Sequence, residues 1–406
     1  MSATARSRRG DVAIVGAGIG GLTLALALRR AGTPCHVYEQ TRRFAEAGAG
    51  LQLAPNAVRV LHRLGLREAL RECAVRVETV ETRRWDDGTP VAGIRLGAAC
   101  EQLYGAPYYT VHRARLHAAL SARLGTDAVS LGHRLTGLDE QQEDVGLHFA
   151  DGRTRRASVA VGADGVHSRV RATIVPDAPV PARTDIYRGL VAAERLPAPL
   201  RAPRVRVWTG PGRHCVTYPV SADTVSFAAT VPAAEDAQCA VGESWSAAGD
   251  PALLLDAYRG WHPLLRALFE AAGQVRRWAL HDRDPVTRWC TARTALLGDA
   301  AHPMLPFMAQ GANQAVEDAA ALAVCLTDGH PVPEALRRYA MLRIPRTTAV
   351  QQGSRANGAT LHLADGAGQR RRDAAMQSAA GPGAMAWLYG HDAEAAAVAG
   401  PAETAL

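Results

Sequence analysis

A glycine-rich turn near the start of the chain constrains the fold more than any other feature. Residues 11–15 form a short apolar run, Gly16, Gly18 and Gly21 follow at once, and residues 22–30 have a helical pattern. In a strand-turn-helix unit of this kind the first glycine permits the tight turn, the second lets the backbone approach a pyrophosphate, and the third allows the helix to pack closely on the strand. The spacing therefore predicts an α/β unit that binds a dinucleotide.

An acidic residue at the end of the next strand supports this interpretation. Residues 35–38 are a second apolar run that ends in Glu39, and 39 − 16 = 23 is close to the offset of about 20 residues expected for an acid that binds a ribose 2′-hydroxyl. A carboxylate at this position argues against a 2′-phosphate. The two strands together favour the adenosine of FAD or NAD.

A segment near the other end of the chain has properties that suit the same ligand. The apolar run 294–297 stops at a turn that contains Asp299, the chain passes through two prolines, and a helical pattern restarts at Gly311, Ala312 and Asn313. A carboxylate at a strand end can accept hydrogen bonds from ligand hydroxyls, whereas the free amides of a helix start can face negative charge. Both properties are needed to hold a flavin.

A third turn makes the resemblance to a known family specific. The apolar run 157–161 is followed by Asp164 and Gly165. With the first glycine turn and the turn at Asp299, this segment resembles the class A (single-component) FAD-dependent aromatic hydroxylases. The match covers nearly the whole chain except its last residues and is most similar to the salicylate, 3-hydroxybenzoate and 6-hydroxynicotinate hydroxylases. Further stretches that carry it are residues 48–66, 111–117 and 387–392.

The resemblance implies an α/β fold in which a Rossmann-like FAD-binding domain is interleaved with a β-sheet substrate domain, as in p-hydroxybenzoate hydroxylase, and is followed by C-terminal helices. Alternating strand patterns between the nucleotide-binding segments agree with this. We expect two helices within 252–272 to cover one edge of the substrate sheet, and a helical break at Pro345. The expected division is an FAD-binding domain of residues 1–75, 106–175 and 285–344, a substrate domain of 76–105 and 176–284, a C-terminal helical segment of 345–392 and a disordered tail of 393–406.

The resemblance also implies an activity. Such an enzyme uses FAD, NADH or NADPH, and O2 to hydroxylate a phenolic or N-heteroaromatic acid through a C4a-hydroperoxyflavin, with or without loss of the carboxyl group. Arg113 would lie against the ribityl and phosphate region, or be a surface arginine; Asp164 would contact FAD and the nicotinamide nucleotide, or only cap a turn. The implied cofactor residues are Gly16, Gly18, Gly21, Glu39, Arg113, Asp164, Gly165, Asp299, Pro303, Gly311, Ala312 and Asn313.

The catalytic base is expected on a strand of the substrate domain. Removal of a phenolic proton makes the ring more electron-rich, and histidine suits this task near neutral pH. His214 and Tyr218 match an active-site pair of the 6-hydroxynicotinate type, and 218 − 214 = 4 puts both side chains on one face of a strand. The alternative is a satisfied histidine in a half-buried strand. His302 is expected to be structural.

The loop between Pro303 and Gln310 departs from several relatives, which carry a glutamine or a histidine there. An apolar wall against the substrate ring is one interpretation, and packing between domains is the other. Arg188 could anchor a substrate carboxylate or hold the domain interface. The residues that replace the polar group are Met304, Phe307 and Met308.

Composition limits the partners. The net charge of +7 over 406 residues is carried by arginine, since the chain has no lysine, and the arginines are scattered. Nucleic-acid binding is therefore not expected, whereas attraction of small anions is. No apolar run is long enough to span a membrane, residues 1–10 lack the core of a signal peptide, and the seven cysteines have no metal-type spacing. We expect a cytoplasmic protein without a metal; the oligomeric state is not indicated.

Three alternatives to an aromatic hydroxylase stay open. The same flavin chemistry could epoxidise or hydroxylate a non-aromatic or larger natural product. A flavin oxidase or reductase would produce peroxide without oxygen transfer. A non-catalytic carrier could keep the fold, although the intact Gly16, Asp164 and Asp299 argue against it.

Overall fold

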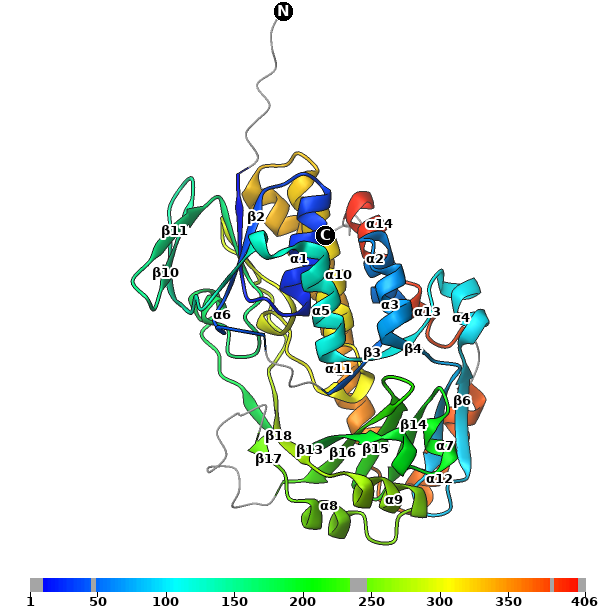
Figure 1. Cartoon of the computed structure of the whole chain (residues 1–406). Helices are drawn as coiled ribbons and strands as arrows, with labels where there is room; N and C mark the ends of the chain where they lie inside the picture. The colour runs from blue at the N-terminus through cyan, green and yellow to red at the C-terminus, as the bar shows by residue number, and fades with distance from the viewer. Residues whose placement is uncertain (1–9, 45–48, 234–246, 380–382, 401–406) are drawn as a thin grey trace, which may run out of the picture.

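The computed structural model describes residues 10–44, 49–233, 247–379 and 383–400 (Figure 1). The basic start at 1–9 and the end of the predicted tail at 401–406 lie outside the described residues, as do 45–48, 234–246 and 380–382. Within the described part, the strands form sheets of five, eight, three and three strands.

The glycine turn belongs to a parallel sheet, as its sequence predicts. The five strands are paired in parallel in the order β19-β12-β1-β2-β8. Strands β1 and β12 are entirely buried, which is typical of parallel strands covered on both faces. The strands of this sheet are β1 (Val12–Val15), β2 (Cys35–Glu39), β8 (Val129–Leu131), β12 (Val159–Gly162) and β19 (Thr294–Leu296).

Three helices pack beside this sheet (Figure 1). Helix α1 (Ile19–Arg30) follows the glycine turn and contacts both α10 (Gly311–Thr327) and α5 (Arg113–Leu124). The buried side chains of these helices and of the parallel strands form one continuous apolar core. The predicted α/β fold is confirmed.

The second large sheet is mainly antiparallel, in the order β17-β18-β13-β16-β15-β14-β5-β6, with β14 and β5 paired in parallel. Helices α8 and α9 cover one of its faces, not an edge as predicted, because Leu265 and Phe269 share an apolar core with Trp208 and Phe227. The other face is turned toward the parallel sheet (Figure 1). These elements are β5 (Thr79–Arg84), β6 (Pro90–Arg95), β13 (Val180–Ala192), β14 (Arg204–Gly210), β15 (Arg213–Pro219), β16 (Thr224–Pro232), β17 (Ala247–Ala248), β18 (Val275–Asp282), α8 (Pro251–Ala257) and α9 (Pro263–Ala271).

Two small sheets and several short helices complete the described chain. The order in the small sheets is β3-β7-β4 and β11-β10-β9. Over the same described ranges, no helix combines the length and the apolar character needed to cross a membrane. The remaining elements are β3 (Gly50–Leu53), β4 (Ala74–Arg76), β7 (Tyr109–His112), β9 (Leu135–Glu140), β10 (Val145–Phe149), β11 (Thr154–Ala157), α2 (Pro55–Arg63), α3 (Arg67–Cys73), α4 (Gly97–Tyr104), α6 (Arg169–Ile174), α7 (Ala198–Arg201), α12 (Ala367–Ala379) and α13 (Ala386–Tyr389).

Helix α11 (Val332–Leu361) runs without interruption through Pro345. A proline inside a helix removes one backbone hydrogen bond. Here Arg343 and Gln351, on either side of the proline, are buried and bonded to other elements, and these tertiary contacts keep the segment helical. The predicted break at Pro345 is wrong.

The predicted disordered tail is also wrong for residues 393–400. Helix α14 (Ala393–Ala399) packs against α10, with Ala393 and Ala397 buried in the main apolar core. The Asp392 side chain accepts a hydrogen bond from the amide of Ala395 and caps the helix. The alanine-rich composition that suggested disorder is what allows close packing on α10.

Candidate active site

A large cavity, with a volume of about 1600 Å³, lies between the parallel sheet and the eight-stranded sheet. Its lining comes from segments that are far apart in the sequence. The predicted residues that line it are Gly16, Gly18, Glu39, Arg113, Asp164, Gly165, Arg188, His214, Tyr218, Asp299, Met304, Gly311 and Ala312.

Most of the predicted cofactor residues meet because their strands are parallel. Gly16 follows β1, Glu39 ends β2, Asp164 follows β12 and Asp299 follows β19. The carboxyl ends of parallel strands lie at one edge of a sheet, and ligands bind at that edge where the strand order reverses, which here is at β1. This edge forms one wall of the cavity.

The glycine turn leaves backbone open to the cavity. Gly16 has a φ of +106°, and a Cβ at this position would lie 2.4 Å from the carbonyl oxygen of Ala163. A Cβ on Gly21 would lie 2.0 Å from the carbonyl oxygen of Gly16, whereas a Cβ on Gly18 would meet no described atom within 4 Å. Gly16 and Gly21 therefore permit the turn and its packing, and Gly18 leaves room for a ligand.

Two helix N-termini border the cavity, and neither has a side-chain cap among the described residues. Helix α1 begins after Gly18 and α10 after Gln310, without a side-chain hydrogen bond to the first turn or an acidic residue in it. Free amides and the helix dipole make such ends binding sites for anionic groups. This donor set fits FAD, whose pyrophosphate suits α1 and whose ring, negatively charged when reduced, suits α10.

The carboxylates of Glu39 and Asp299 differ in the hydrogen bonds that they accept from the protein. Glu39 accepts hydrogen bonds from the amides of Ala17, at 2.8 Å, and Thr41, at 2.9 Å, so it shapes the glycine turn as well as facing the cavity. Asp299 accepts no hydrogen bond from the residues that the structure describes, and burial raises its pKa. Its oxygens are therefore available to ligand hydroxyls.

Asp164 lines the cavity, but its hydrogen bonds cap a helix. It accepts from the Ser168 hydroxyl at 2.5 Å and from the amides of Arg169 at 2.7 Å and Val170 at 3.2 Å, at the start of α6. Burial raises its pKa despite these bonds. The turn-capping interpretation therefore describes its contacts within the protein.

Arg113, at the start of α5, is exposed and lines the cavity.

Five predicted residues lie outside the lining of the large cavity. Gly21 packs α1 closely on the turn at Gly16, and the Asn313 side chain bonds the backbone of Gln52, Ala54 and Ala309. Pro303 lines a smaller cavity next to the large one. Phe307 and Met308 lie in the turn at Pro306–Met308 and pack against α11, Phe307 at Gly358 and Met308 at Gly353. Both side chains therefore contribute to packing and do not form a wall of the large cavity. These residues are Gly21, Pro303, Phe307, Met308 and Asn313.

Three polar side chains of the eight-stranded sheet line the cavity. His214 and Tyr218 lie on one face of β15 and both line the cavity, as their spacing predicts. Burial raises the pKa of Tyr218, and Ser226 and Gln52 oppose this shift. Arg188 of β13 lies near Tyr218, and burial lowers its pKa.

The sequence profile described as FAD binding domain matches residues 9–354 of the chain. The chain belongs to the FAD-binding aromatic hydroxylases. This hydroxylase is 47% identical to 3-amino-4-hydroxybenzoate 2-monooxygenase PtnB3 of Streptomyces platensis, over 95% of this chain and 97% of that protein. It is 37% identical to 6-hydroxynicotinate 3-monooxygenase of Bordetella bronchiseptica, over 85% of this chain and 91% of that protein.

Solved structures agree with the assignment. A salicylate hydroxylase substrate complex has a TM-score of 0.81 and 28% identity, covering 96% of this chain and 97% of that one. HpxO of Klebsiella pneumoniae, complexed with FAD and uric acid, has a TM-score of 0.83 and 26% identity with the same coverage. The predicted family, fold, cofactor and reaction class are confirmed: the chain is an FAD-dependent aromatic monooxygenase.

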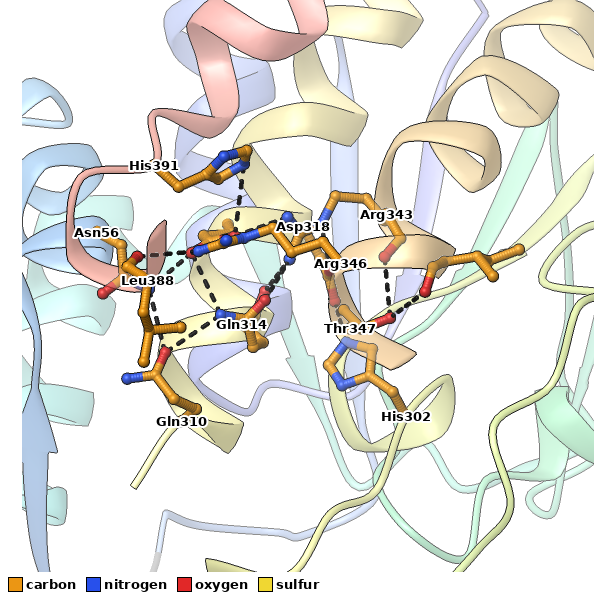
Figure 2. A network of polar contacts seen from close by, with 12 residues as sticks. Asn56, His302, Gln310, Gln314, Asp318, Arg343, Arg346, Thr347, Leu388 and His391 are labelled. Carbon is orange, nitrogen blue, oxygen red and sulfur yellow. Dashed lines mark hydrogen bonds and ion pairs between the residues drawn. The ribbon is translucent and has the colours of Figure 1, made fainter. Parts of the chain in front are cut away.

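A buried charge network supports the turn that carries Asp299 in this hydroxylase (Figure 2). Asp318 of α10 accepts hydrogen bonds from the amide of Gly298 at 3.0 Å and from Arg343 Nε at 2.7 Å, and lies 2.5 Å from His302 Nε2. His302 is completely buried and is not part of the cavity lining, a position that fits the structural role expected for it. The network thus ties α10 and α11 to the 298–302 turn.

The neighbouring acid Glu317 shares the same cation. It accepts from Arg343 at 2.6 Å, from Arg346 at 2.6 Å and from Asn56 at 2.6 Å. Burial alone would raise the pKa of both acids, but His302 and Arg343 lower that of Asp318, and Arg343 and Arg346 that of Glu317, each to about 2. Both carboxylates are therefore ionised inside the protein. The sequence signal for this network is a pair of adjacent acids inside an otherwise apolar helix, which requires buried cations.

The sequence analysis also missed His362. Its ring Nε2 lies 2.7 Å from Nδ1 of His214. It caps the C-terminus of α11, and no local pattern marks it. A contact across 148 residues of sequence is visible only in the folded chain.

Proposed function

We propose that this hydroxylase adds a hydroxyl group to a benzoate that already carries a phenolic hydroxyl, and that 3-amino-4-hydroxybenzoate is the first substrate to test. The observation that carries the proposal is Arg188, a cation in the cavity without an ion-pair partner in the described part of the chain. The 47% identity to 3-amino-4-hydroxybenzoate 2-monooxygenase of Streptomyces platensis supports the choice of ring.

The environment of Arg188 favours a carboxylate ligand. Its guanidinium lies over Trp278, with 4.4 Å from Cζ to the ring centroid, and its Nε is buried without a hydrogen-bond partner. Burial lowers its pKa because the surroundings do not compensate the charge. A guanidinium in this state gains strongly from a bidentate bond to a carboxylate. A benzoate supplies that group, and Met304 offers the ring an apolar contact.

His214 and Arg188 would together prepare the ring for oxygen transfer. His214 is placed to accept the phenolic proton, and the positive charge of Arg188 stabilises the anionic substrate. When bound, FAD passes two electrons from NADH or NADPH to O2, so that one oxygen atom enters the ring and the other leaves as water. Asp299 and the start of α10 would hold the flavin end of the cofactor.

We further propose that the part around the parallel sheet binds FAD, that the eight-stranded sheet binds the ring, and that the enzyme works in the cytoplasm. The cavity lining supports the division, because nucleotide-type turns lie on one side and His214 and Arg188 on the other. The cysteines of the described residues are all free, as is usual in a reducing compartment, where NADH and NADPH are also available.

Oxidation of NADH and NADPH by the FAD-loaded protein tests the proposal. The panel contains 3-amino-4-hydroxybenzoate, 3-hydroxybenzoate, salicylate, 6-hydroxynicotinate and larger phenols, with hydroxylated product and peroxide both measured. Product that matches the nucleotide consumed supports the hydroxylase and identifies the ring. Stimulation that produces only peroxide would favour an oxidase, and no response to the panel would favour a non-aromatic substrate.

The role of Arg188 can be tested by changing either Arg188 or the carboxylate of the substrate. Arg188→Gln should raise KM for the acid by about 10- to 150-fold, the equivalent of a hydrogen bond to a charged group of about 1.5–3 kcal/mol, and leave FAD content unchanged. The parent should discriminate against the methyl ester of the acid, and the variant should not. Arg266→Gln, on the exposed face of α9, is the matched control. Equal discrimination in parent and variant would refute the role of Arg188.

A further inference from the structure

The rings of His214 and His362 form a direct contact behind the substrate face of the cavity. Nδ1 of His214 lies 2.7 Å from Nε2 of His362. The ring centroids are 5.0 Å apart and the planes are inclined by 29°, so the rings meet at their nitrogen-bearing edges and not face to face. One nitrogen of the pair therefore carries the shared proton and the other accepts it.

The two histidines connect the cavity with the outside of the protein. His214 is 3% exposed and lines the cavity, whereas His362 is partly exposed and is absent from that lining. Neither Nε2 of His214 nor Nδ1 of His362 has a hydrogen-bond partner among the residues that the structure describes. One end of the pair is thus open to the substrate and the other to solvent.

Neighbouring side chains hold the pair in place. Thr230 Oγ1 lies 3.4 Å from His214 Nδ1 and 3.3 Å from His362 Nε2, and accepts a hydrogen bond from the backbone amide of His214 at 2.9 Å. The ring of Phe307 packs edge-on against both histidines. Arg213 is the charged group that acts on His362, and no carboxylate of the described residues acts on either ring.

This environment disfavours the protonated, charged form of each ring. Burial, and to a lesser degree His362, lowers the pKa of His214 to about 3. Burial and the charge of Arg213 lower the pKa of His362 to about 4. A single base of such low pKa takes up a phenolic proton unfavourably. Two neutral rings avoid this cost, because one proton can enter at the cavity while another leaves at the surface.

We propose that His362 is a relay residue that passes the phenolic proton from His214 to solvent. The inference rests on the phenolic substrate of the proposed function. The phenol O–H bond breaks as an N–H bond forms at Nε2 of His214, the proton on Nδ1 of His214 moves to Nε2 of His362, and the proton on Nδ1 of His362 passes to water. No electrons are transferred, and the phenolate stays in the cavity beside Arg188. The rings return to their first tautomers when the sequence runs in reverse.

The test uses the FAD-loaded protein and 4-hydroxy-3-nitrobenzoate, a phenolic acid whose phenolate absorbs visible light. A stopped-flow pH jump on the complex measures how fast the bound phenol loses its proton, without any turnover. We expect His362→Ala to bind the probe as the parent does and to slow its deprotonation at least about tenfold. The control His330→Ala removes an exposed histidine that precedes α11 and should leave the rate unchanged.

Chemical rescue separates a relay from a structural role. Imidazole can accept a proton at one nitrogen and donate one from the other, so it should restore the rate of His362→Ala. 1-Methylimidazole fills the same space but cannot pass a proton on, and should not restore it. Equal rates in parent and variant, or rescue by both compounds, would overturn the relay alone. Failure of the probe to bind the parent would overturn the proposed substrate class and the relay with it.

Discussion

Replacement of Arg343 by methionine should destabilise the FAD-saturated protein by about 3–5 kcal/mol, the usual cost of removing one partner of a buried ion pair. Arg343 is 1% exposed and donates to Asp318 at 2.7 Å and to Glu317 at 2.6 Å (Figure 2). Methionine preserves much of the side-chain length, so the main change is that two buried carboxylates lose their shared cation.

The pKa values of Asp318 and Glu317 lead to a similar loss of stability for this variant. The pKa of Asp318 falls from 3.8 to about 2, and that of Glu317 from 4.5 to about 2. At about 1.36 kcal/mol per pKa unit, these shifts correspond to about 2 and about 3 kcal/mol. Arg346 and His302 supply part of this stabilisation and remain in the variant. The expected loss therefore lies within the range for a broken buried pair.

Urea titration of the parent and the variants, each saturated with FAD, measures the free energy of unfolding. Arg266→Met removes an exposed ion pair with Glu270 and should change it by less than about 0.5 kcal/mol. Adding Asp318→Asn to Arg343→Met should recover part of the loss, because it removes a carboxylate left without its cation. A loss below about 1 kcal/mol for Arg343→Met, or a further loss in the double variant, would refute the reasoning.

Three further predictions concern the cofactor, the base and pH. Asp299→Ala should weaken FAD binding by about 10- to 150-fold, since a charged acceptor of ligand hydroxyls contributes about 1.5–3 kcal/mol; FAD affinity equal to that of the parent, by flavin fluorescence titration, would contradict the assignment. His214→Ala should keep its FAD and lose product about 100-fold or more while peroxide rises; full coupling of NAD(P)H oxidation to product would exclude His214 as the base. Because the folded pKa values of Glu317 and Asp318 are depressed, their stabilisation is present above pH about 4.5 and is lost as the pH falls toward about 2; an unfolding midpoint that does not change between about pH 4.5 and about pH 2 would show that their charges do not stabilise the fold.

The local sequence pattern was enough to predict residues that line one side of the cavity. Gly16, Glu39 and Asp299 each follow or end an apolar run that is visible in the sequence, and parallel strands bring their carboxyl ends to one edge of the sheet. His214 and Tyr218 could be placed on one face because side chains alternate along a strand. In each case the spacing of neighbouring residues determines the direction of the side chain.

Local spacing could not predict the direction of side chains in turns, nor the partners that a side chain meets on distant elements. Phe307 and Met308 lie in a short 3-10 turn, where no regular period fixes which way a side chain points, and both pack on α11 instead of lining the cavity. Asn313 stands at a helix start that the sequence predicts, but its amide bonds the backbone of Gln52 and Ala54 at the end of β3 and of Ala309 before α10. Knowing the element did not identify the partner.

The sequence by itself determined the nucleotide-binding strands and helices, the edge where their acids meet, and the strand that carries the histidine. Only the tertiary structure decided that His362 meets His214, that Arg343 neutralises the acids of α10, that Pro345 stays within a helix and that α14 is ordered. The physical reason is how far apart in the chain the interacting residues lie. Glycine turns and strand alternation are set by residues next to each other in the chain, whereas ion pairs, imidazole contacts and the packing of alanines gain their free energy from elements that only folding brings together.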